Sequence, residues 1–149
     1  MPGTIGVGAP STLIETGSNV YHEGGCSCGA VRFIAEGTPV NVRACHCRLC
    51  QKVMGSPFFA RALFDQHVLK VTGPTAAYAT SAAIERVYCV RCGTRLFARR
   101  TNGTFIGVAL AGFDDRNAFA PTHHTWVSEK VAWLRLDDGL PQYPEAAPE

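Results

Sequence analysis

The hexapeptide CHCRLC, residues 45–50, places three thiols within six positions. In extended chain, a C-x-C step turns both sulfurs to one side because alternate side chains share a face. The following C-x-x-C step wraps a tight loop around the same point, as paired zinc ligands do. A tetrahedral zinc held by three protein ligands keeps its fourth position for water or substrate. We therefore predict an open, catalytic zinc site at Cys45, Cys47 and Cys50.

The other four cysteines form a second pattern, CSC at residues 26–28 and CVRC at residues 89–92. A C-x-C pair and a C-x-x-C pair together supply the four thiolates of a closed structural zinc. A disulfide framework uses an even number of cysteines and would leave one of the seven unpaired. Metal binding is therefore favoured over disulfide or redox chemistry. The predicted ligands of this second zinc are Cys26, Cys28, Cys89 and Cys92.

Composition narrows the class of protein. At 149 residues the chain fits one domain. The formal charge of +2 counts thiols as neutral, and seven ionised thiols with two zinc ions would bring it to about −1. The basic residues are scattered, so nucleic acid is not an expected partner. With no signal peptide, no membrane-length apolar run and many free thiols, we expect a cytoplasmic protein without a membrane partner.

The chain divides into three predicted parts. Residues 1–19, rich in Gly, Ser, Thr and Pro, are interpreted as a flexible leader; residues 20–144 form the zinc-binding domain, and residues 145–149 form a tail. Short apolar segments separated by Gly and Pro turns predict a mainly β domain with the cysteine pairs on hairpin tips. The predicted strands cover residues 30–36, 40–44, 57–64, 68–71, 76–80, 84–89, 94–98 and 104–110, with a helical turn at 48–53 and late apolar segments at 124–127 and 131–136.

Four motifs carry a family resemblance: GGCSCGAVR at 24–32, CHCRLCQ at 45–51, CVRCGT at 89–94 and HTWVSEKVAW at 124–133. Together they resemble the glutathione-dependent formaldehyde-activating enzyme family, which also includes the centromere protein V domain. The resemblance covers about residues 20–144. It implies several small, bent antiparallel sheets built around zinc-binding hairpins. It also implies two zinc ions, a structural one on the first and third motifs and a catalytic one on the middle motif.

The resemblance further implies a carbon–sulfur lyase similar to S-hydroxymethylglutathione synthase, with a glutathione-like thiol and an aldehyde as partners. A thiol that coordinates the open zinc loses its proton, and its sulfur can then attack formaldehyde. Three thiolates leave the zinc site with a net charge of about −1, which favours thiol exchange over water activation. Two alternatives remain open: a non-catalytic zinc-binding interaction or thiol-carrier module, and a redox or metal-storage protein that uses the three cysteines as a labile cluster.

Several aromatic side chains lie near the motifs. We expect His46, between two ligands, to point away from the metal, either on the surface or behind the ligands. His123 and His124 are interpreted as structural, with His124 packing beside Trp126. Trp126 and Trp133 are expected in the core or packed on a sheet.

Two polar residues near the motifs each have two possible roles. Arg48 could hold an anionic substrate group or lie in solvent, and Gln51 could bond a ligand sulfur or cap the loop. Asp114 and Asp115 are interpreted as turn residues. A fourth protein ligand for the open zinc could come from one of four histidines: His22, His67, His123 or His124.

Overall fold

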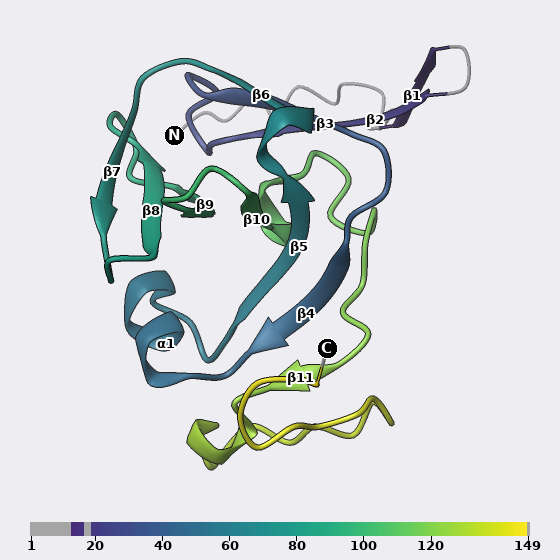
Figure 1. Cartoon of the computed structure of the whole chain (residues 1–149), viewed down its shortest axis with the longest axis vertical. Coiled ribbons are helices and arrows are strands. Elements are labelled where there is room, and N and C mark those ends of the chain that lie inside the picture. The colour runs from purple at the N-terminus through teal and green to yellow at the C-terminus, as the bar shows by residue number, and fades with distance from the viewer. Residues whose placement is uncertain (1–12, 17–18, 149) are drawn as a thin grey trace.

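The computed structural model describes residues 13–16 and 19–148. The domain is mainly β, as predicted (Figure 1). Its strands are β1 (Leu13–Thr16), β2 (Asn19–Gly25), β3 (Arg32–Glu36), β4 (Asn41–Cys45), β5 (Phe59–Asp65), β6 (Leu69–Thr72), β7 (Thr75–Ala79), β8 (Ile84–Cys89), β9 (Arg95–Arg100), β10 (Phe105–Ala109) and β11 (His124–Thr125). The helices are α1 (Arg48–Met54) and the 3-10 turns Gln66–Val68, Leu110–Gly112 and Val127–Glu129.

Within the described residues the strands form two sheets. The four-stranded sheet has the order β1-β2-β3-β6, and the seven-stranded sheet has the order β11-β4-β5-β10-β9-β8-β7. Every strand pair is antiparallel except β11 with β4. In Figure 1 the four-stranded sheet crosses the top of the molecule, while β4 and β5 descend from it to α1 and β11.

Most predicted strands form within two residues of their expected bounds, and β8 matches its range. The predicted leader lies outside the described residues except for 13–16 and 19, where β1 pairs with β2. The late segment at 131–136 forms turns. The Lys130 ammonium donates to the carbonyls of Val131 at 3.1 Å and Leu134 at 2.5 Å, and these two bonds hold the segment in a turn. No helix in the described part of the chain has the length and apolar character needed to cross a membrane.

Phe33 is the centre of the core that joins the two sheets. Residues along β3 alternate between exposed and buried positions, and Phe33 is 1% exposed. Its ring makes edge-on contacts with Phe97 of β9 and with Phe113, both at a centroid distance of 5.3 Å. Edge-to-face pairs of this kind stabilise a core beyond the area they bury. This one side chain therefore couples the four-stranded sheet to the seven-stranded sheet.

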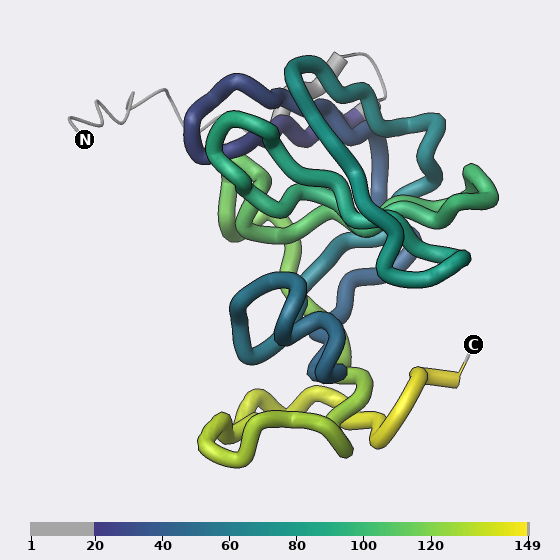
Figure 2. Tube along the Cα trace, turned by 90° about the vertical axis from the view of Figure 1, so that its left-hand side faces the viewer, coloured from purple at the N-terminus to yellow at the C-terminus, as the bar shows by residue number. Residues whose placement is uncertain are grey.

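The β4–α1 loop is fixed by chain far away in sequence. In β11, His124 pairs with Ala44 and Thr125 pairs with Cys45. The His46 amide donates to the Thr125 carbonyl at 3.0 Å, and the Tyr143 amide donates to the His124 carbonyl at 2.9 Å. Figure 2 shows the C-terminal chain running beneath α1 and the end of β4. The cysteine loop is thus held on the far side from the four-stranded sheet.

We expect Phe33→Ala to lower the free energy of unfolding by about 3–5 kcal/mol, because it leaves a cavity between the sheets. The neighbouring variant Ile34→Ala is the control, since Ile34 lies on the opposite face and is 37% exposed. It should cost about 1 kcal/mol. Urea unfolding followed by circular dichroism measures both values. Equal losses would contradict the role assigned to Phe33.

Candidate metal centres

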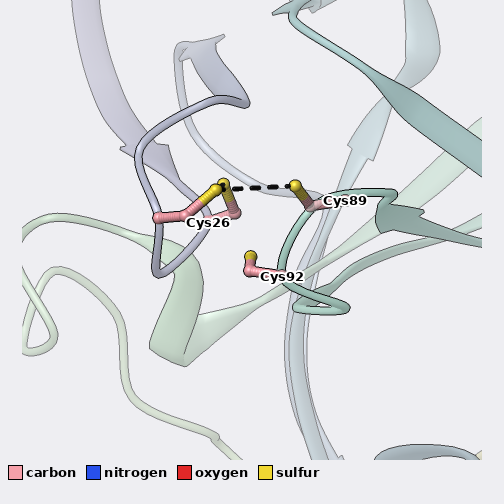
Figure 3. A group of neighbouring side chains, drawn as sticks. Cys26, Cys89 and Cys92 are labelled. Atoms are coloured by element: carbon pink, nitrogen blue, oxygen red, sulfur yellow. Dashed lines mark hydrogen bonds between the residues drawn. The ribbon is translucent and has the colours of Figure 1, made fainter. Parts of the chain in front are cut away.

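The first cysteine cluster brings together two hairpins. Cys26 and Cys28 lie in the β2–β3 turn, Cys89 ends β8, and Cys92 lies in the β8–β9 turn. Their four sulfurs lie within 4.8 Å of one another, with Cys26 Sγ 3.5 Å from Cys28 Sγ and Cys28 Sγ 3.8 Å from Cys89 Sγ. Figure 3 shows the labelled sulfurs turned toward a common centre. Tetrahedral zinc with bonds of about 2.3 Å requires sulfurs about 3.8 Å apart, so this cluster fits zinc.

Hydrogen-bond donors surround these sulfurs. The Val31 amide donates to Cys26 Sγ at 3.2 Å, and the Arg91 amide donates to Cys89 Sγ at 3.4 Å. Hydrogen bonds with Ser27 and Thr94 lower the pKa of Cys92 to about 4. Such donors favour the thiolate form that binds metal and orient the ligands.

The second cluster occupies the β4–α1 loop. Cys45 ends β4 and Cys50 lies in α1, both 6% exposed, and Cys47 is the half-buried N-cap of the helix. The Cys50 amide donates to Cys47 Sγ at 3.3 Å, so the cap itself directs one sulfur. The three sulfurs lie within 4.8 Å of one another. In the described chain, no histidine nitrogen or carboxylate oxygen joins this cluster. The donor set is therefore three thiols with one side left for another ligand.

The three thiols cannot all ionise without a cation. Hydrogen bonds from Cys47 and Cys50 hold the pKa of Cys45 well below its usual range. Hydrogen bonds among the same three thiols raise the pKa of Cys50, and the one with Cys45 has the largest effect. Like charges at this separation disfavour one another, so ionisation of one thiol opposes ionisation of the other two. A divalent cation would remove that conflict, so the cluster fits a metal.

A cavity of about 210 Å³ adjoins the three cysteines. Arginines from four strands and two aromatic rings contribute to its wall, beside smaller apolar side chains. The Arg86 guanidinium donates to Cys50 Sγ at 3.8 Å and lies over the Phe59 ring at 5.6 Å. The lining residues are Arg43, Cys45, Cys47, Cys50, Phe59, Arg61, Leu63, Ile84, Arg86, Ala98, Arg100, Gly107 and Trp126.

The sequence reasoning missed the arginines of this cavity. They are spread over nearly sixty positions and form no motif. The available signal was their alternation with apolar neighbours in β4, β5 and β8, which places each arginine on one face of its strand. Alignment of those faces depends on the strand register, which the sequence alone does not supply.

Arg48 and Gln51 lie outside the cavity. Arg48 is exposed and lines a separate surface depression with Lys52 and Trp133. The Gln51 amide donates to the carbonyls of His46 and Glu129 at 2.8 and 2.9 Å. Of its two expected roles, Gln51 therefore caps the loop, and it also ties the loop to the C-terminal segment.

His46 is fully buried, so the surface alternative for this residue was wrong. Its Nε2 lies 2.9 Å from His124 Nδ1, and His124 Nε2 lies 2.7 Å from Asp138 Oδ2. Burial lowers the pKa of His46, which therefore acts as a neutral imidazole. The side chain points toward the C-terminal segment and anchors the cysteine loop from behind.

Of the two tryptophans expected in the core or packed on a sheet, Trp126 packs against the buried cluster around Cys45, Cys50 and Phe59, whereas Trp133 does not pack in the core. Trp133 is 72% exposed because the chain around it forms surface turns instead of a packed strand. Trp126 is half-buried, with a left-handed backbone at φ 57°, and lies in the cavity wall. That conformation is costly for a bulky residue, and here it ends β11 and turns the indole toward the cysteines.

The remaining candidates have structural positions. Asp114 pairs with Arg32, and Asp115 Oδ1 accepts from the Asn117 amide at 2.9 Å, as expected for turn residues. His22 is buried against Phe119, and His67 is exposed on a 3-10 turn. His123 packs on the Tyr143 ring at 5.9 Å. None of these histidines reaches the three-cysteine cluster of the described chain.

The residues matched by the family model for the glutathione-dependent formaldehyde-activating enzyme are 21–129, which include both clusters. The chain belongs to this family. It is 34% identical over 126 residues to a Halomonas elongata protein named as a candidate glutathione-dependent formaldehyde-activating enzyme, covering 77% of this chain and 80% of that protein. The predicted resemblance is thereby confirmed.

Two further likenesses extend the comparison. An uncharacterized lyase of Schizosaccharomyces pombe is 33% identical over 82 residues, which is 55% of this chain and 60% of that protein. A crystal structure of a Rhodobacter sphaeroides protein superposes with a TM-score of 0.50 at 20% identity, covering 81% of this chain and 98% of the other. At this identity, the likeness to the Rhodobacter sphaeroides structure shows a shared fold alone.

We expect Asp138→Ala to lower the midpoint of urea unfolding, because the buried His124 N–H loses its carboxylate acceptor. The neighbouring Asp137→Ala is the matched control, since both carboxylates are exposed and, within the described chain, it is Asp138 that bonds His124. Asp137→Ala should change stability by less than about 0.5 kcal/mol. Urea unfolding measures stability, and hydrogen exchange at the His46 amide reports loosening of the loop. Equal effects of the two variants would show that the histidine pair does not anchor the loop.

Proposed function

We propose that this protein is a zinc-dependent carbon–sulfur lyase of the formaldehyde-activating type, which forms or breaks an S-hydroxymethyl adduct of a thiol such as glutathione. The observation that carries the proposal is the three-cysteine cluster, which has no fourth protein ligand in the described chain and adjoins a cavity. Family membership supports the same chemistry. The seven free thiols support a reducing compartment, the cytoplasm.

In the proposed site, Cys45, Cys47 and Cys50 would hold zinc through their sulfurs. A zinc ion held there would favour the thiolate form of an incoming thiol. The thiol sulfur then bonds to the carbonyl carbon, the carbonyl π electrons pass to oxygen, and that oxygen takes up the proton lost by the thiol. Trp126 and Phe59 provide apolar wall that excludes water from the reacting atoms.

The four-cysteine cluster is proposed to hold a structural zinc. Structural zinc sites contribute about 10–16 kcal/mol of apparent binding free energy, which is comparable to the stability of a whole domain. Because this cluster joins the turn of one sheet to the turn of the other, its metal would stabilise the arrangement around the cavity.

We expect two zinc ions per purified chain by elemental analysis. Cys47→Ser should bind one zinc ion and remain folded, because its loop is also held by β11 and by Gln51. Cys92→Ser should fail to fold, because the closed cluster would lose a ligand. Circular dichroism checks the fold of each variant. One zinc ion per chain, unchanged by Cys47→Ser, would exclude a metal at the three-cysteine cluster.

The expected activity is adduct formation from glutathione and formaldehyde at about tenfold or more above the spontaneous rate, since only a few per cent of a free thiol is ionised at neutral pH. Carbon-13 exchange spectroscopy measures this rate without a coupled enzyme. Cys47→Ser should return the rate to the spontaneous value. Thiol binding without rate enhancement would instead indicate the thiol-carrier module.

A further inference from the structure

The cavity beside the three cysteines contains four arginines that the proposed reaction does not use. We call Arg43, Arg61, Arg86 and Arg100 the arginine pocket. They come from β4, β5, β8 and β9 of one sheet, and Arg43 is the direct cross-strand partner of Arg61. Two like charges opposite each other destabilise a sheet unless a counter-charge lies between them.

Two of these side chains are deeply buried. Arg61 and Arg86 are each 7% exposed. Burial and the neighbouring Arg43 lower the pKa of Arg61 to about 9. Nε and Nη1 of Arg86 and Nε of Arg43 are buried without a hydrogen-bond partner. A buried donor without an acceptor is costly, and a buried charge more so, which indicates that an acceptor is missing.

The described chain supplies no carboxylate to these arginines. Its arginine–carboxylate pairs are Arg32 with Asp114 and Arg99 with Glu85, and both lie outside the pocket. Arg61 donates to the neutral amide oxygen of Asn41. The three cysteines balance only part of the positive charge, because a zinc ion reduces three thiolates to a net charge of about −1. Of the four pocket arginines, Arg86 is the one whose guanidinium donates to a cysteine sulfur in the described chain.

The backbone leaves room for the Arg61 side chain. A Cβ atom on Gly107 would lie 2.7 Å from Arg61 Cδ and 3.5 Å from its Nε. Gly107 is central in β10, where glycine lowers strand stability because it has no side chain to pack. Its presence lets the Arg61 side chain lie flat against the strand and keeps its guanidinium in the cavity.

We propose that the arginine pocket binds the oxyanion group, a carboxylate or a phosphate, of a small substrate whose sulfur lies at the three-cysteine cluster. The position of the sulfur rests on the proposed function; the anion site does not. Arginine presents paired N–H donors that match both oxyanions. Arg86 reaches Cys50 with Nη2 and keeps Nε and Nη1 free, so the anion lies beside the metal ligands.

The size of the cavity restricts the substrate class further. Its volume of about 210 Å³ is smaller than the roughly 300–1,000 Å³ of cavities that enclose drug-sized ligands. With a sulfur at one end and an oxyanion among the arginines, a short acidic thiol, or its aldehyde adduct, fills the space. The acid group then lies only a few bonds from the sulfur.

The test is calorimetric titration of the zinc-loaded full chain with two thiols, the anionic 3-mercaptopropionate and the neutral 2-mercaptoethanol. We expect the anionic thiol to bind at least about tenfold more tightly. Arg86→Gln and Arg100→Gln should remove most of that difference. Arg100→Gln should also leave 2-mercaptoethanol binding unaffected, because within the described chain it is Arg86, not Arg100, that donates to a cysteine sulfur. Arg100 is exposed at the cavity edge, so its variant keeps the test valid if Arg86→Gln fails to fold.

Arg99→Gln is the matched control. Arg99 precedes Arg100 in β9 but pairs with Glu85 outside the pocket, so its loss should leave both thiols bound as before. Equal binding of the two thiols, or equal effects of Arg99→Gln and Arg100→Gln, would overturn the proposal.

Competition by simple ions separates the anion site from the proposed chemistry. Acetate or inorganic phosphate should displace 3-mercaptopropionate but not 2-mercaptoethanol, and the more effective ion identifies the oxyanion. The preferred ion should still bind Cys47→Ser, whose arginine pocket is intact. That result would support the anion site even if neither thiol bound zinc. Displacement by neither ion would overturn the anion site and leave the zinc–thiol reaction standing.

Discussion

The convergence of sulfurs from two distant hairpins is the constraint on which the rest of this structure depends. Cys26 and Cys28 belong to a hairpin of one sheet, and Cys89 and Cys92 belong to a hairpin of the other. A metal bound to these four sulfurs would hold both hairpins at once, and the Phe33 ring fills the space between the sheets. The arginines of the cavity come from β4, β5, β8 and β9 of the seven-stranded sheet, and the cysteine junction holds this sheet at the end of β8.

The three-cysteine loop is rigid for a different reason. Seven residues of helix would be unstable alone, because a short helix does not recover the cost of its nucleation. Here β11 pairs with β4, Gln51 bridges two carbonyls, and the His46–His124–Asp138 chain fills the space behind the loop. These contacts hold the sulfurs in place before any metal binds, which reduces the ordering cost of binding.

The charges of the site form two opposed layers. The thiols lie at the loop, and the guanidinium groups lie on the sheet behind the cavity. Neither layer is neutral by itself, and the Arg86–Cys50 contact is their direct link in the described chain. A metal bound to the thiols and an oxyanion bound to the guanidinium groups would balance the charge of each layer. Charges beside a protein interior interact more strongly than in bulk water, so they would also orient a substrate along the axis between them.

The sequence by itself determined the β class, the division of seven cysteines into four and three, and the family, because these features depend on local spacing and local turns. Only the tertiary structure decided the burial of His46, the exposure of Trp133, the placement of Arg48 away from the site and the arginine pocket. The physical reason is strand register. A shift of one residue in β5 or β8 would turn Arg61 or Arg86 to the other face, and no local pattern in the sequence fixes that register.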